Sequence, residues 1–91
     1  MRLEVGDKID LFRGGELQLI LTVQEVNDNT VKAVARNGYV SRFRRVYKGT
    51  TIKNADPMAD NGYLHTGQAP EHLPSEQSKE RYFQRLRELG G

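Results

Sequence analysis

The stretch "LQLILTVQEVNDNTVKAVARNGYVSRFRR", residues 17–45, decides the fold. It begins with apolar residues at every second position, a period of two that is typical of a strand with one buried face. "NDN" at 27–29 is rich in turn-forming residues. In the segment 30–36, small apolar residues again alternate with more polar ones. We therefore predict two antiparallel strands, the first with a wholly apolar face formed by Leu17, Leu19, Leu21 and Val23.

The pair Asn37-Gly38 is a strong hairpin signal, because a two-residue type I′ turn needs positive φ at both positions. It predicts that the segment 30–36 pairs with the segment "YVSRFRRVYKG", residues 39–49.

Further strands are expected on both sides of this stretch. "KIDLF" (8–12) alternates Ile9 and Leu11 against Asp10 and Phe12, and the glycine pair 14–15 can turn the chain. "TTIK" (50–53) predicts a short fifth strand. Five short strands with tight turns indicate a small antiparallel barrel, since a flat sheet of this size would leave two edges exposed.

Beyond residue 53 the pattern changes. Residues 54–74 contain all three prolines and predict an extended loop or linker, whereas 75–89 predict one C-terminal helix with Ser75 as its N-cap. We expect this helix to dock on the barrel of residues 1–53, so that the chain forms one domain. The alternative is that its apolar residues bind a groove on a partner protein; these are Tyr82, Phe83, Leu86 and Leu89.

Composition limits the function classes. The chain has 91 residues and no cysteine, so it has neither a disulfide framework nor a thiolate zinc site. No secretory signal is visible, and the longest apolar-rich stretch, "LQLILTV", is far too short to span a bilayer. We expect a cytoplasmic protein without a membrane partner.

Charge is distributed unevenly. Residues 1–53 carry ten Lys/Arg against six Asp/Glu, a net charge of +4, whereas residues 54–91 carry four against six, a net charge of −2. The segment 36–49 alone holds five basic residues and no acidic one. Such a patch can attract phosphate groups or an acidic protein surface.

Two interpretations of this segment remain open. In one, arginines contact phosphates and tyrosines stack on bases; in the other, the basic residues form an ordinary solvated strand face. The candidate nucleic-acid-binding residues are Arg36, Arg42, Arg44, Arg45 and Lys48 for charge, and Tyr39 and Tyr47 for stacking.

Strict alternation would place Arg45 among the aromatic residues of the buried face. A β-bulge near Arg44 and Arg45 would avoid this. We therefore hypothesise such a bulge, with Phe43 and Val46 pointing inward and the arginines pointing outward.

Catalytic and metal sites are not expected. The loop residues Asp56, Asp60, Asn61, His65 and His72 match no calcium-loop or His-Glu-x-x-His spacing, and no serine lies in a nucleophile elbow. We predict a protein that is not an enzyme and that needs no cofactor and no metal.

The segments "VGDKIDLFRGGE" (5–16), "TVQEVNDNTVKAV" (22–34) and "YVSRFRRVYKG" (39–49) together resemble the SH3-like small barrels of the KOW type over residues 3–53. That family includes ribosomal proteins, transcription-elongation modules and small bacterial and phage proteins. The resemblance implies a small barrel that binds RNA, DNA or protein, and it rarely implies catalysis.

The sequence therefore predicts a mainly β fold, a five-stranded SH3-like barrel with an extended loop and one C-terminal helix. The leading functional prediction is a binding module that contacts nucleic acid, or a nucleoprotein complex, through the basic strand face. The alternative is a protein-interaction adaptor, for example a phage-type binder of a host protein, which uses the barrel edge or the C-terminal helix.

Overall fold

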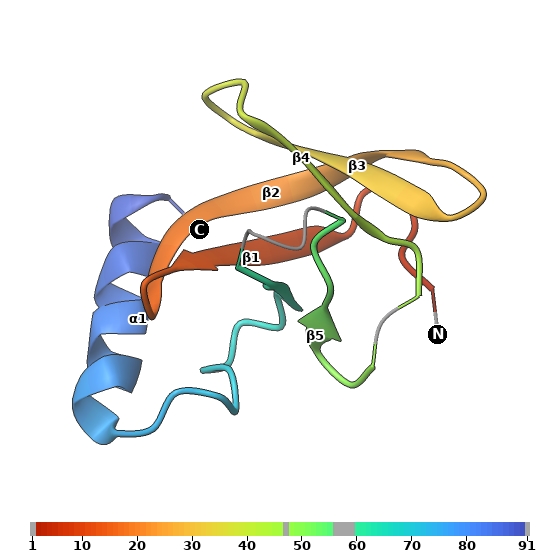
Figure 1. Cartoon of the computed structure of the whole chain (residues 1–91). Helices are drawn as coiled ribbons and strands as arrows, with labels where there is room; N and C mark the ends of the chain where they lie inside the picture. The colour runs from red at the N-terminus through yellow and green to blue at the C-terminus, as the bar shows by residue number, and fades with distance from the viewer. Residues whose placement is uncertain (1, 47, 56–59, 91) are drawn as a thin grey trace.

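The computed structural model describes residues 2–46, 48–55 and 60–90. One antiparallel sheet has the strand order β4-β3-β2-β1-β6-β5, and a single helix follows it (Figure 1). The mainly β prediction with one C-terminal helix is confirmed. The elements are β1 (Lys8–Arg13), β2 (Glu16–Val26), β3 (Thr30–Ala35), β4 (Val40–Arg44), β5 (Thr51–Ile52), β6 (Gly62–Leu64) and α1 (Glu76–Glu88).

The sheet has six strands rather than five. The additional strand, β6, lies within the segment 54–74 that was predicted as loop, and it pairs with both β1 and β5. Its three residues are too few to show a period of two, and they lie in a stretch rich in proline and glycine. The strand forms because β1 and β5 pair with it, and this pairing cannot be inferred from its three residues alone.

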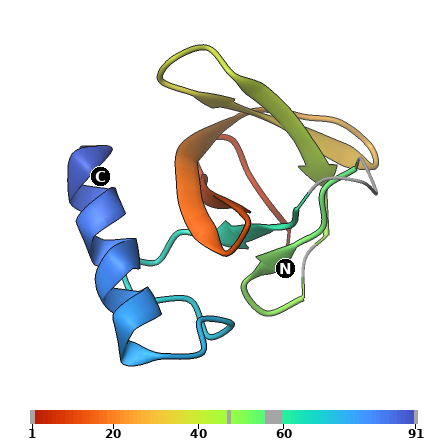
Figure 2. The ribbon, with the colours of Figure 1, turned by 60° about the vertical axis from the view of Figure 1, so that its left-hand side comes forward.

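The sheet curls so strongly that its two ends meet. A β-bridge joins Phe43, on β4, to Asn54, two residues beyond β5. Two backbone hydrogen bonds flank it, from Arg44 N to Lys53 O (2.9 Å) and from Ala55 N to Arg42 O (3.0 Å). Figure 2 shows the strands arranged around a common centre. The curled sheet therefore has an inner face that holds the core and an outer face that is open to other contacts.

The inner face is filled mainly by apolar side chains of the strands, to which β6 contributes only Gly62 and the partly buried Leu64. The buried residues are Leu3, Ile9, Leu11, Leu21, Val23, Val31, Ala33, Ala35, Phe43 and Ile52.

Leu17 does not belong to this inner set, so its predicted place on the face of Leu19 and Leu21 is wrong. The β1–β2 register shifts by one residue, from Leu11 opposite Leu19 to Phe12 opposite Leu17. The extra residue of such a bulge reverses the alternation, so that side chains beyond it lie on the other face of the sheet. Leu17 is consequently buried on the outer face.

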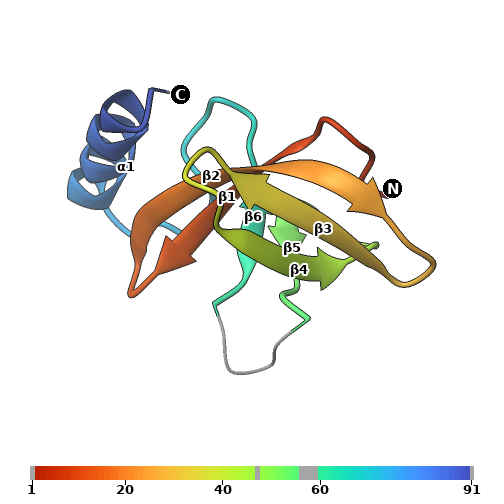
Figure 3. The ribbon, with the colours of Figure 1, turned by 90° about the horizontal axis from the view of Figure 1, so that it is seen from above.

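A second apolar cluster forms on that outer face, under α1. Phe12, Leu17, Leu73 and Tyr82 are buried there, and Leu86 is among the partly buried residues packed against them. The helix begins after Ser75, whose side chain accepts a hydrogen bond from Ser78 N. Figure 3 shows α1 beside the β1–β2 hairpin, at the other end of the molecule from the β2–β3 hairpin.

In the described ranges, no helix is long and apolar enough to cross a membrane.

The β3–β4 turn differs from the predicted type I′ turn. Ala35 N donates to Tyr39 O (2.8 Å), which leaves a three-residue loop between them. Within this loop only Gly38 has a positive φ, of 91°. Every other positive φ among the described residues also belongs to a glycine. This geometry is the common three-residue hairpin loop, in which one glycine takes the left-handed position.

Candidate functional site

The β4 strand sorts its side chains by strict alternation. Ser41 and Phe43 are buried, whereas Arg42 and Arg44 are exposed. The ladder with β3 is regular from Val40 to Arg44. The two arginines at the centre of the predicted basic segment therefore point outward from the same strand.

The hypothesised bulge at Arg44 and Arg45 is wrong. The alternation continues past β4, so that Arg45 is partly buried and Val46 is 60% exposed. Backbone pairing continues beyond β4, since Arg45 N donates to Asn29 O and Leu3 N donates to Arg45 O. Within the described part of the chain, the buried Nε of Arg45 has no hydrogen-bond partner. Arg45 is therefore not a member of the outward basic surface.

Register places two more cations beside Arg42 and Arg44. Lys32 on β3 is directly opposite Arg42. Lys53 is opposite Arg44, because the bridge between Phe43 and Asn54 sets the register where the sheet closes. Residues opposite one another in antiparallel strands project from the same face, with Cβ atoms about 4.5–5.5 Å apart. We call this group of four residues the basic face: Lys32, Arg42, Arg44 and Lys53.

The basic face is electrostatically unbalanced. Like charges directly opposite each other on neighbouring strands destabilise a sheet. Glu25 on β2 lies opposite Lys32 and is the nearest acidic position in the register. No ion pair among the described residues involves the basic face; the pairs lie elsewhere, as Asp10–His65, Glu76–Lys79, Glu16–Arg81 and Glu88–Arg85. Its charge is therefore available to an external anion.

The other predicted residues of this segment lie apart. Arg36, in the β3–β4 loop, directs its guanidinium toward the end of α1, where Nη1 would be 3.5 Å from a Cβ placed on Gly90. Tyr39 is 52% exposed in the same loop. Lys48 is exposed in the turn before β5, and Tyr47 lies outside the described residues.

The helix residues proposed for a partner face the chain's own barrel. Tyr82 is only 2% exposed, and Phe83, Leu86 and Leu89 are partly buried against the cluster under α1.

A polar cluster that sequence reasoning missed lies under the helix. Asp10, on β1, is 1% exposed. The hydroxyl of Tyr82 donates to Asp10 Oδ2 at 2.6 Å, and His65 Nδ1 lies 2.8 Å from Oδ1. Burial raises the pKa of the Asp10 carboxyl, although Tyr82 and His65 partly oppose this shift. Burial and the neighbouring carboxylate also raise the pKa of the Tyr82 hydroxyl, which therefore remains a donor at neutral pH.

The loop residues considered for a metal site do not come together. Asp60 accepts from Gly14 N, Asn61 accepts from Asn54 N, and His72 stacks on Tyr63 with ring centroids 3.9 Å apart. His65 belongs to the Asp10 cluster, and Asp56 lies outside the described residues. Across the described ranges, no three His, Cys, Asp or Glu side chains are close enough to hold a metal ion.

No family model, no curated protein and no solved structure matches the chain. The structure itself shows a small, mainly β domain whose strongly curled antiparallel sheet carries a cluster of cations on its outer face.

Proposed function

We propose that the protein is a small, non-enzymatic binding module of the SH3-like, KOW type that contacts nucleic acid without sequence preference. The observation that carries this proposal is the basic face, in which two like-charged pairs stand opposite each other. Glu25, opposite Lys32, is the acidic position beside them, and no ion pair among the described residues involves the four cations. Binding of a polyanion would relieve this repulsion, and phosphate backbones supply the opposite charge.

The geometry of the face supports phosphate contacts rather than base recognition. Four flexible cations project from a regular strand surface, and the described residues on that surface between them are not aromatic. Affinity should therefore come from released counterions and fall steeply with salt concentration.

The test is a titration of labelled single- and double-stranded DNA and RNA at two salt concentrations. We expect the double variant Arg42→Ala/Arg44→Ala to lower the slope of log K against log salt by about 1.5, since each lost phosphate contact removes about 0.7–0.9.

The matched control is Arg13→Ala/Arg87→Ala, which removes the same charge from exposed positions at the end of β1 and on α1. It should leave both the affinity and the salt slope near wild type. Equal losses in both double variants would mean that net charge alone drives binding. Absence of binding at low salt would refute the proposal.

A second candidate function is a protein-interaction adaptor, such as a phage-type binder of a host protein. Exposed valines support it: Val46 and Val5 are 60% and 66% exposed, and Val40 is also exposed. Scattered apolar exposure is common on small domains, so this observation weighs less than the basic face. A salt-insensitive complex that Val46→Ser weakens would favour the adaptor.

A further inference from the structure

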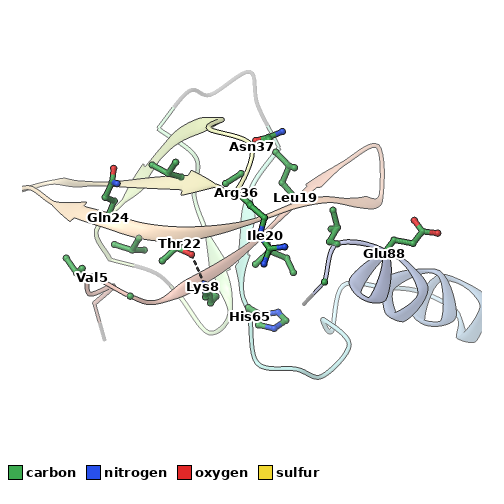
Figure 4. Close-up of a pocket in the computed structure, with 16 residues that line it drawn as sticks. Val5, Lys8, Leu19, Ile20, Thr22, Gln24, Arg36, Asn37, His65 and Glu88 are labelled. Carbon is green, nitrogen blue, oxygen red and sulfur yellow. Dashed lines mark hydrogen bonds between the residues drawn. The ribbon is translucent and has the colours of Figure 1, made fainter.

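A groove of about 1010 Å³ runs between the outer sheet face and the C-terminal end of α1 (Figure 4). It is distinct from the basic face, whose four residues do not line it. Its apolar lining comes from three elements and includes Ile20 on β2, Val34 on β3 and Leu89 after α1. All three side chains are partly exposed. The groove thus continues the apolar surface that α1 covers only in part.

Cationic and polar groups gather at one end of this groove. Lys8 and His65 are neighbours across the β1–β6 pair, because His65 N donates to Lys8 O at 3.0 Å. Lys8 Nζ donates to Thr22 Oγ1 at 2.7 Å, which holds the ammonium over the sheet face. His65 Nδ1 lies 2.8 Å from Asp10 Oδ1, and Nε2, when it carries a proton, can donate to another partner. Figure 4 shows Lys8 and His65 on the same side of the groove.

The charge of the lining favours an anion. Arg36 supplies a second cation from the β3–β4 loop, and Glu88 is the acidic residue of the lining. Glu88 is already paired, since Arg85 Nη1 donates to its Oε2 at 2.7 Å. Lys8 has no acidic partner among the described residues. A ligand that complements this groove therefore joins an apolar body to one negative group.

We propose that the groove binds a free amphipathic carboxylate, with its anionic group at Lys8 and His65 and its hydrocarbon body along Ile20, Val34 and Leu89. The volume of about 1010 Å³ lies just above the usual range for small-molecule sites, about 300–1,000 Å³. An apolar lining with a few convergent polar groups is the usual composition of such sites. This binding activity is additional to nucleic-acid binding and uses a different surface.

The test is a titration of the full chain with octanoate, octanol and octylammonium, all below micelle formation, followed by amide chemical shifts and calorimetry. We expect saturable binding of octanoate, with shifts at Ile20, Val34 and Leu89, and weaker or no binding of the neutral and cationic analogues. Lys8→Gln should weaken octanoate binding about tenfold or more, the usual effect of losing a charge-assisted hydrogen bond. Val34→Thr keeps the side-chain shape and should also weaken binding.

Arg42→Ala provides the matched control, because it removes a cation from the basic face and not from the groove. It should leave octanoate binding unchanged while it lowers nucleic-acid affinity, so the two proposals fail independently. Failure of octanoate to saturate, or equal binding of octanol, would overturn the inference. A lipid surface is the alternative source of the same chemistry; capture by phosphatidylglycerol vesicles without binding of octanoate would also overturn it.

Discussion

At the scale of single residues, Asp10 shows that burial opposes the ionisation of a carboxyl group. Its carboxyl group is almost inaccessible, and burial raises its pKa above the ordinary value of 3.8. The folded state therefore favours the protonated form more than the unfolded state does. The resulting stability is fully present below the ordinary pKa and is lost as pH rises through the folded pKa, at about 1.4 kcal/mol for each unit of the shift.

We predict that Asp10→Asn gains stability relative to wild type as pH rises from below to well above the ordinary pKa of 3.8, because the wild-type carboxyl then loses a proton that burial favours. The amide oxygen of asparagine can still accept from the Tyr82 hydroxyl. Urea unfolding in both pH ranges measures the difference. Asp28→Asn, in the exposed β2–β3 turn, is the control and should track wild type. If Asp10→Asn instead lost stability with rising pH, the ionised carboxylate would be a net stabilising group.

At the scale of elements, β6 depends on one glycine. A Cβ on Gly62 would stand 2.6 Å from Ile9 Cγ2 and 2.9 Å from Phe43 Cε1, both far inside ordinary contact distance. Gly62 thus leaves the space in which these two core side chains meet. We predict that Gly62→Ala lowers the free energy of unfolding by about 1–3 kcal/mol through overpacking. Thr51→Ala, on the exposed side of β5, should change it by less than about 0.5 kcal/mol. Equal effects in denaturant unfolding would show that the core relaxes around the added methyl group.

The elements also show which features could be predicted from sequence. Period-two alternation predicted β1 to β4 because the inward positions of each strand carry apolar residues, although β1 is buried on both of its faces. It misplaced Leu17, because a bulge leaves no mark in the hydrophobic pattern. It could not find the contact of Asp10 with Tyr82, since the two residues are 72 positions apart and meet only when α1 docks.

At the scale of the whole molecule, the basic face is completed only when the sheet closes on itself. Arg42 and Arg44 could be identified from the sequence, and Lys32 stands at an outward position of β3. Lys53 joins them through the bridge between Phe43 and Asn54, which brings the end of the barrel segment back to β4. Nucleic-acid affinity should consequently depend on a residue that no local pattern connects with the arginines.

We therefore predict that Lys53→Ala lowers the salt slope of nucleic-acid binding by about 0.7–0.9, as much as Arg44→Ala does, because each removes one phosphate contact. Lys79→Ala, which removes the same charge from α1, should leave the slope unchanged. Titrations of single-stranded RNA at several salt concentrations measure all three variants. A Lys53→Ala slope equal to wild type would confine the interface to β3 and β4. In that case closure of the barrel would serve stability alone, and the contact surface would end at the β4 strand.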